Sequence, residues 1–249
     1  MQIRVLGSAA GGGFPQWNCN HPNSRKARSG HPAAQRRTQS SIAVSVDGER
    51  WLLCNASPDL RQQINDNAVL QPAATGPLRA SPIAAVVLTN ADVDHITGLL
   101  TLRESQAFNL YATGKVQAVL AANTVFNVLN PQFVKRLPFE LDKPFTPLAA
   151  DAAPLGMTVT AFPVPGKVAL WLEDAAKGVD IGAVGEDTVA LEVNDPATGK
   201  TFFYIPACAR MTDELAARIR GAALVFFDGT LWVDDEMIRD GVGVKTGQR

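Results

Sequence analysis

Cysteine and histidine are scarce in this chain of 249 residues, with three of each. The cysteines, Cys19, Cys54 and Cys208, are odd in number and widely spaced, so a disulfide framework is not expected. Each cysteine is instead a core residue or a candidate metal ligand. The scarcity of histidine limits the kinds of metal site that the chain can build.

An excess of positive charge and a long apolar run are also missing. The net charge is −1, and 19% of the residues are charged. This balance gives no reason to expect a nucleic-acid or anionic-membrane partner, so small molecules or peptides are favoured. No apolar stretch reaches the roughly 18 residues that cross a bilayer. The N-terminal residues go directly into a strand pattern rather than a signal peptide, which predicts a cytoplasmic protein.

The chain does have enough apolar residues, 46%, for a sizeable core. Strands are predicted where apolar runs are bounded by turn residues, and helices where Ser57 and Thr212 provide N-caps. Strands are expected at residues 3–6, 41–46, 50–54, 83–88, 110–112, 158–164, 190–193, 202–205 and 224–227, the last of them buried. Asp47-Gly48 predicts a hairpin between the strands at 41–46 and 50–54. Helices are expected after Ser57, after residue 95, within 116–128 and through residue 219. The order favours a two-sheet sandwich flanked by helices and folded as one domain.

The most informative segment follows the predicted strand at residues 83–88. It reads Asn90-x-Asp92-x-Asp94-His95 and leads into a helical pattern. Side chains at the end of a buried strand are held rigidly at an edge where α/β proteins place their chemistry. In an extended segment Asp92 and Asp94 would project to the same side, with His95 beside them. Oxygen and imidazole ligands together suit iron, manganese or zinc.

A purely structural interpretation of this segment is also open. Asn90, Asp92 and Asp94 are good turn and N-cap residues, and a helix N-terminus stabilises a carboxylate. Capping alone does not explain His95.

Taken with other segments, the motif carries a family resemblance. It resembles the His-x-His-x-Asp-His motif of the metallo-β-lactamase superfamily, with Asn90 and Asp92 in place of the first two histidines. Together with residues 7–19, 38–44, 55–59, 88–100 and 227–230, it resembles the pyrroloquinoline quinone (PQQ) biosynthesis proteins of that superfamily. The resemblance implies an α+β fold, the αββα sandwich. It also implies a metal site held by Asp92, Asp94 and His95, with Asp228 as a weaker fourth ligand.

Cys208 follows a predicted strand and could face the same site, or could simply be a small buried residue. Lys167 lies where the superfamily often has a ligand histidine, and a protonated lysine cannot bind metal. We take Lys167 as a candidate for binding a substrate carboxylate. With His21, His31 and His95 as the only imidazoles, a two-metal hydrolytic site is not expected. The family continues beyond residue 249, so the chain is expected to be a single domain, residues 1–249, truncated at its C-terminus, with an incomplete metal site.

The segment around Cys19 resembles a cysteine cluster of the family that is similar to a structural zinc site. Here Cys19 and His21 remain as ligand types, but Ser24 stands at the third position, so a mobile loop is favoured over bound zinc. The glycines at residues 11–13 lack a phosphate-binding pattern and are expected to allow a close backbone approach or a tight turn. The basic residues that follow, Arg25, Lys26, Arg28, Arg36 and Arg37, would attract carboxylates or form a solvated loop.

The resemblance implies two functions. One is an Fe(II)-dependent oxygenation of the tyrosine ring in a Glu- and Tyr-derived peptide precursor of PQQ; zinc is the other metal considered. The alternative is a non-catalytic carrier of PQQ or its precursor for transport to the periplasm. The oligomeric state is open, with a homodimer among the alternatives.

Overall fold

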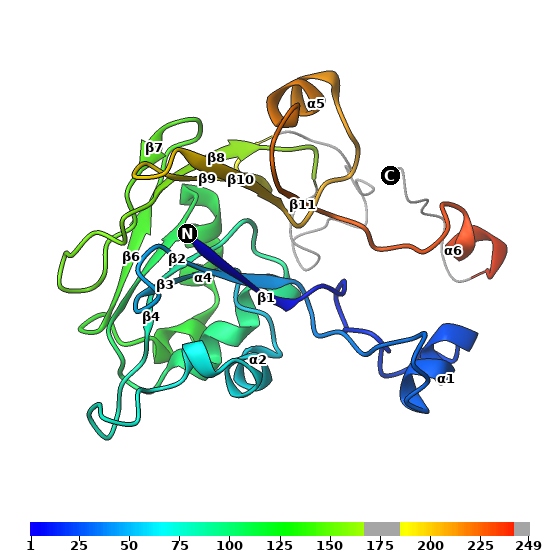
Figure 1. The fold of residues 1–249 in the computed structure, drawn as a ribbon, viewed down its shortest axis with the longest axis horizontal. Helices are drawn as coiled ribbons and strands as arrows, with labels where there is room; N and C mark the ends of the chain where they lie inside the picture. The colour runs from blue at the N-terminus through cyan, green and yellow to red at the C-terminus, as the bar shows by residue number, and fades with distance from the viewer. Residues whose placement is uncertain (167–184, 242–249) are drawn as a thin grey trace.

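The computed structural model describes residues 1–166 and 185–241, and its framework is two β-sheets packed face to face (Figure 1). The first sheet has six strands in chain order: β1 (Gln2–Gly7), β2 (Ser41–Ser45), β3 (Trp51–Cys54), β4 (Ile83–Val87), β5 (Phe108–Ala112) and β6 (Val134–Pro138). The second has the order β11-β10-β9-β8-β7: β7 (Pro144–Phe145), β8 (Thr158–Pro163), β9 (Val189–Asp195), β10 (Lys200–Ile205) and β11 (Val225–Phe227).

The pairing directions decide where side chains can meet. Strands β3 to β6 pair in parallel, so their carboxyl ends share one edge of the first sheet. The second sheet is antiparallel except for β10 and β11, which run parallel. In such sheets ligands bind outside the carboxyl ends of the parallel strands.

Three apolar clusters separate the layers. One lies between the sheets and uses alternate residues of each strand, such as Leu52 and Cys54 on β3. The opposite face of the first sheet packs against helices, and the outer face of the second sheet packs against one helix. The helices are α1 (Pro22–Arg28), α2 (Leu60–Asp66), α3 (Val93–Ile96), α4 (Gly114–Ala122), α5 (Asp213–Ile219) and α6 (Glu236–Arg239), with 3-10 turns η1 (Ala68–Leu70), η2 (Thr97–Leu102) and η3 (Thr124–Val128). The layers are therefore those of an αββα sandwich.

Several local predictions are confirmed. The hairpin of β2 and β3 turns at Gly48, which has a φ of 81°, and it pairs Ile42 with Cys54. Thr212 accepts a hydrogen bond from the Leu215 N–H and caps α5.

Other predictions are wrong in physically clear ways. Ser57 does not cap α2; its hydroxyl donates to Gln63 Oε1 at 3.1 Å, and the helix begins at Leu60. The expected helix within 116–128 divides into α4 and η3, because Asn123 takes an extended conformation. β11 is an edge strand rather than a buried one, and Phe227 is 41% exposed.

One helix arises from the basic stretch that had no predicted element. α1 begins at Pro22, where His21 Nδ1 accepts the Asn23 N–H. It lies to one side of the sheets, beside α6, and His21 Nε2 is 3.5 Å from Asp240 Oδ2 (Figure 1).

Candidate metal centre

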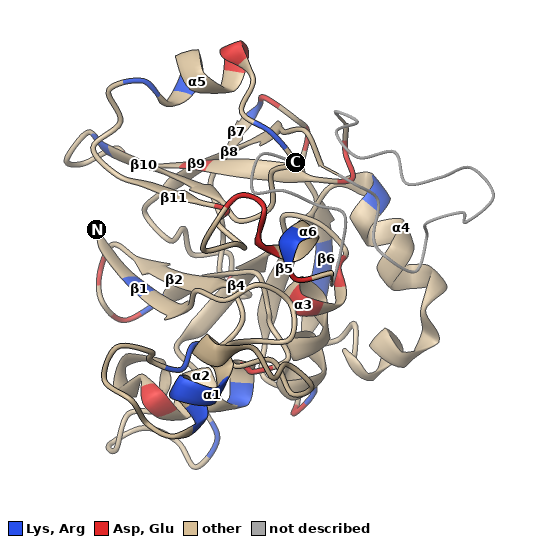
Figure 2. Cartoon of the chain, turned by 90° about the vertical axis from the view of Figure 1, so that its right-hand side faces the viewer, with Lys and Arg blue, Asp and Glu red and all other residues tan. Residues whose placement is uncertain are grey.

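The Asn90–His95 motif lies at the carboxyl end of β4 and turns the chain into α3. Asn90 Oδ1 accepts the Asp92 N–H at 3.0 Å, and Asp92 keeps an extended conformation before the helix begins at Val93. The expected extended segment through Asp94 is therefore wrong, because Asp94 lies in the first turn of α3, whose acidic character is visible in Figure 2.

His95 is held in one orientation. Its Nδ1 lies 2.7 Å from Asn90 Oδ1, and both residues are 3% exposed. Because this Asn90 atom also receives a backbone N–H, it is the oxygen and not the amide nitrogen. Nδ1 therefore carries the proton, and Nε2 has a free lone pair. This is the arrangement found for metal-binding imidazoles, in which a second group fixes the tautomer.

Asp94 faces that lone pair. Its Oδ2 lies 3.9 Å from His95 Nε2, and its side chain is 23% exposed. A β-carbon built at Gly11 would lie 3.4 Å from the same oxygen, so the glycine loop approaches Asp94 closely. Gly12 and Gly13, with φ values of 89° and 75°, form the tight turn that was the other expectation for these glycines.

Asp228 comes to the motif from the second sheet. It follows β11, and its N–H donates to the Ile205 carbonyl at 2.8 Å. Burial raises the pKa of its carboxyl group, and the charge of Asp94 adds to this, while hydrogen bonds from the Cys208 N–H and the Thr230 hydroxyl act in the opposite direction. A half-buried carboxylate near another carboxylate is relieved by a cation.

Cys208 touches this group through its backbone. Its N–H donates to Asp228 Oδ2 at 3.2 Å, whereas its Sγ donates to the Arg210 carbonyl at 3.1 Å. Burial raises the pKa of the thiol. Both observations favour a protonated, structural role for the side chain rather than metal ligation.

The donor types thus fit a divalent metal, and the pairing of Asp94 and His95 supplies two of them. Within residues 1–166 and 185–241, however, no group of three or more His, Cys, Asp or Glu side chains is arranged to hold a metal ion. Lys167 lies outside the described residues. The described part of the chain therefore does not assemble the expected set of four ligands, and Asp94 and His95 are the pair that it brings together.

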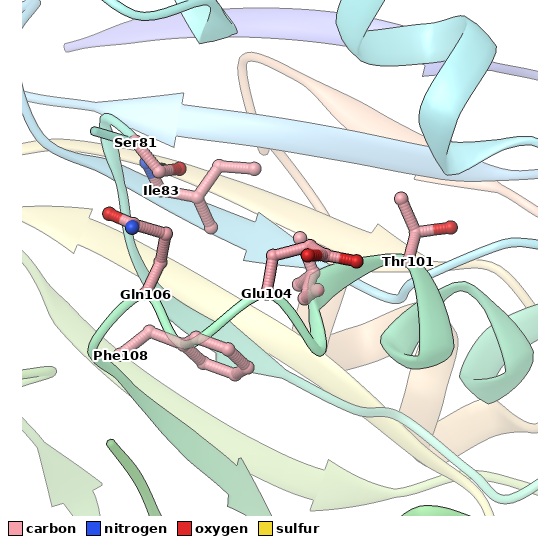
Figure 3. A pocket seen from close by; sticks show the side chains of 7 residues that line it. Ser81, Ile83, Thr101, Glu104, Gln106 and Phe108 are labelled. Carbon is pink, nitrogen blue, oxygen red and sulfur yellow. Dashed lines mark hydrogen bonds between the residues drawn. The ribbon is translucent and has the colours of Figure 1, made fainter. Parts of the chain in front are cut away.

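A small cavity elsewhere does not compete as a substrate site. It has a volume of about 80 Å³ and lies beside Ile83, Thr101 and Phe108, at the amino ends of β4 and β5 and away from the motif (Figure 3). Small-molecule sites usually measure about 300–1,000 Å³.

At the second candidate site, around Cys19, the side chains of the expected zinc ligands make local hydrogen bonds. Cys19 Sγ accepts a hydrogen bond from the Ser24 hydroxyl at 3.1 Å, which lowers the pKa of the thiol. His21 uses Nδ1 to cap α1. The nearby basic side chains, including Arg25, Arg28 and Arg36, donate to backbone carbonyls of their own segment. Figure 2 shows the basic residues of α1 in blue.

Sequence reasoning missed the residues that support the site. Asn55, with a φ of 61°, exchanges hydrogen bonds with Thr89 beneath the motif. Gln39 Oε1 accepts the Gly12 N–H, and Asp59 accepts both the backbone and the side-chain N–H of Gln39. No sequence signal marks these pairs, because their members come from separate elements.

Similarity to known proteins identifies the family of this chain. The family model for the beta-lactamase superfamily domain matches residues 50–246. Coenzyme PQQ synthesis protein B of Rhizobium meliloti is 53% identical over 249 residues, which are 100% of this chain and 78% of that relative. The chain belongs to the coenzyme PQQ synthesis protein B family. The same protein of Gluconacetobacter diazotrophicus is 54% identical over 251 residues, covering 100% of this chain and 80% of the relative.

Solved structures give the same family. The crystal structure of Zn²⁺-bound PqqB from Methylobacterium extorquens has a TM-score of 0.91 and 53% identity, covering 100% of this chain and 79% of that one. A diphosphatase of the PhnP family has a TM-score of 0.61 at 19% identity, over 91% of this chain and 72% of its own, and it shows the shared fold alone. The predicted family and the αββα fold are confirmed. In the described residues no helix is both long and apolar enough to span a membrane.

Proposed function

We propose that this chain acts in coenzyme PQQ synthesis by an Fe(II)-dependent oxygenation of the tyrosine ring in a Glu- and Tyr-derived precursor. The observation that carries the proposal is the orientation of His95, whose Nε2 faces Asp94 at the carboxyl end of β4. The family gives the pathway, and the donor set gives the kind of chemistry.

The histidine content favours one metal ion with open positions over a two-metal hydrolytic site. His95 is the imidazole of the motif, whereas His21 caps α1 and His31 Nδ1 accepts the Ala33 N–H. A mixed carboxylate and imidazole set suits Fe(II) and O₂ chemistry.

Asp92, Asp94 and His95 would hold the metal, with Asp228 closing the site from the second sheet. When bound, iron supplies the ability to activate O₂. Asn90 holds the proton on His95 Nδ1 and keeps Nε2 available. The Cys208 N–H and the Thr230 hydroxyl orient the Asp228 carboxylate by donating to its two oxygens. Lys167, or the basic segment at residues 25–37, would bind the carboxylates of the precursor.

The reaction balances as a hydroxylation. One oxygen atom of O₂ enters a ring C–H bond to give C–OH. The other leaves as water, taking two electrons from a reductant and two protons. A two-electron reductant such as ascorbate is therefore part of the assay.

The test is anaerobic reconstitution with Fe(II), followed by O₂, ascorbate and the Glu-Tyr precursor, with the product mass as readout. We expect a gain of one oxygen atom in the wild type, its loss in Asp94→Ala and His95→Ala, and its retention in the control His31→Ala. Circular dichroism checks that each variant folds. Tight binding of PQQ without any oxygen gain would overturn the proposal in favour of the carrier.

A further inference from the structure

The two sides of the proposed metal site come from different sheets. Asp94 and His95 follow β4 of the first sheet, and Asp228 follows β11 of the second. The separation of these side chains therefore depends on how the sheets are joined at this edge. One join is a backbone hydrogen bond of 2.9 Å, from the Val189 N–H to the Thr89 carbonyl.

A second join is made by the phenol of Tyr204. Tyr204 lies on β10 and pairs with Phe226 of β11, two residues before Asp228. Its side chain is 2% exposed and crosses to the first sheet, where Oη lies 3.1 Å from the Ser40 hydroxyl. Burial raises the pKa of this phenol, and the Ser40 and Asn55 side chains beside it act in the opposite direction. Tyr204 thus connects β10, which pairs with the strand before Asp228, to Ser40 just before β2.

From Ser40 the contacts continue to Asp94. The Ser40 N–H donates to the Ala9 carbonyl at 2.9 Å, and this bond holds the start of the glycine loop. Gly11 of the same loop lies against the Asp94 carboxylate. Each step is a short contact between neighbouring residues, so a shift of Ser40 moves the loop that packs on Asp94.

We propose that Tyr204 is a positioning residue of the metal site, whose phenol fixes Asp94 relative to Asp228 through Ser40 and the glycine loop. The inference rests on the proposed metal site and concerns its assembly from two sheets. Removing the hydroxyl leaves the part-buried Ser40 hydroxyl without this partner, so it rearranges. Groups that orient metal ligands in this way commonly change metal affinity by 10–100-fold when removed.

The chain offers a matched control in its other tyrosine. Tyr111 belongs to the same inter-sheet core and is 6% exposed. Its hydroxyl accepts the Leu148 N–H at 3.0 Å, and its ring stacks on Phe145, so its polar contact is made away from the motif. Tyr111→Phe and Tyr204→Phe each remove one buried hydroxyl and change nothing else.

The test compares these variants for Co(II) affinity, the Co(II) absorption spectrum and, without metal, amide exchange at Gly12. We expect Tyr204→Phe to bind Co(II) about 10-fold more weakly, with a shifted spectrum and faster exchange at Gly12. Tyr111→Phe should match the wild type in all three, although both variants lower the urea midpoint. Ser40→Ala should reproduce the Tyr204→Phe effect without adding to it in the double variant.

Equal behaviour of Tyr204→Phe and Tyr111→Phe would overturn the inference and leave the proposed function standing. Absence of His95-dependent Co(II) binding in the wild type would overturn both. Ser40→Thr keeps the hydroxyl and is expected to retain the wild-type affinity for Co(II). Its comparison with Ser40→Ala separates the effect of the hydrogen bond from that of packing.

Discussion

Asn90 and His95 form a buried pair in which one amide oxygen, 2.7 Å from Nδ1, serves both the imidazole and the turn before it. The same oxygen accepts the Asp92 N–H. The turn before α3 and the orientation of the His95 ring thus both depend on a single atom. A substitution there affects both properties at once.

Asn90→Leu keeps the approximate size of the side chain and removes the acceptor. We expect a loss of about 1–3 kcal/mol in the free energy of unfolding, because two buried N–H groups lose their partner. We also expect a 10–100-fold loss of Co(II) affinity. Urea unfolding and metal titration measure the two effects. Asn90→Asp retains an oxygen at this place and should stay close to the wild type; an unchanged affinity in Asn90→Leu would contradict the assigned role.

Gly98 allows the chain after α3 to lie directly against the end of β3. A β-carbon at this position would overlap the Ser57 carbonyl oxygen and come within 2.8 Å of the Ala56 carbonyl carbon. Because these atoms are backbone, they cannot rotate away. Gly98→Ala should therefore destabilise the protein by about 3 kcal/mol in urea unfolding, at the upper end for overpacking. The control Gly114→Ala, at the start of α4, has its nearest neighbour at 3.8 Å and should be neutral or slightly stabilising.

Asp47 gives a pH dependence that is separate from the metal site. Burial acts to raise the pKa of its carboxyl, but N–H groups of Arg50 and Glu49, the Ser45 hydroxyl and the Arg50 side chain outweigh this and lower it to about 2. Since the folded pKa lies below the unfolded one, the carboxylate stabilises the fold above about pH 4. This stabilisation disappears as the pH falls from about 4 to about 2.

Asp47→Asn keeps an oxygen acceptor and removes the charge. At pH 7 we expect a loss of about 1–2 kcal/mol, reduced from the full pKa shift because the side chain is 33% exposed. Urea unfolding at several pH values measures the difference between the two proteins. The difference should shrink toward pH 2, and a constant difference would show that the charge is not responsible.

The sequence predicted the parts of this molecule that are encoded locally. Two β-rich runs joined by Asp47-Gly48 were enough for the β2–β3 hairpin, and Thr212 was enough for the start of α5. The prediction of Ser57 as an N-cap was wrong because its hydroxyl donates to Gln63 Oε1 instead. The two side chains meet only in the folded turn. α4 ends before Asn123, earlier than predicted, because Asn123 is extended, and no glycine or proline at this place indicated the end.

For the candidate site, the spacing from Asn90 to His95 indicated a segment that the structure places at the end of β4. It did not indicate which atoms would pair, because the role of Asn90 Oδ1 depends on where α3 begins. The contacts of Asp94 with the Gly11 loop and of Tyr204 with Ser40 join segments far apart in the chain. Such contacts depend on strand order and sheet packing, and neither is written in a local pattern.

The delivery of Asp228 and of the Asp94–His95 pair by opposite sheets also orders events during folding. Contacts between distant segments form late, after the cost of closing the long loop between them has been met. A nascent chain in which only the first sheet has formed positions His95 and Asp94, but not Asp228, which follows β11 of the second sheet. Metal binding at the proposed site would therefore report that the two sheets have docked, and a Co(II) spectrum recorded during refolding would time that step.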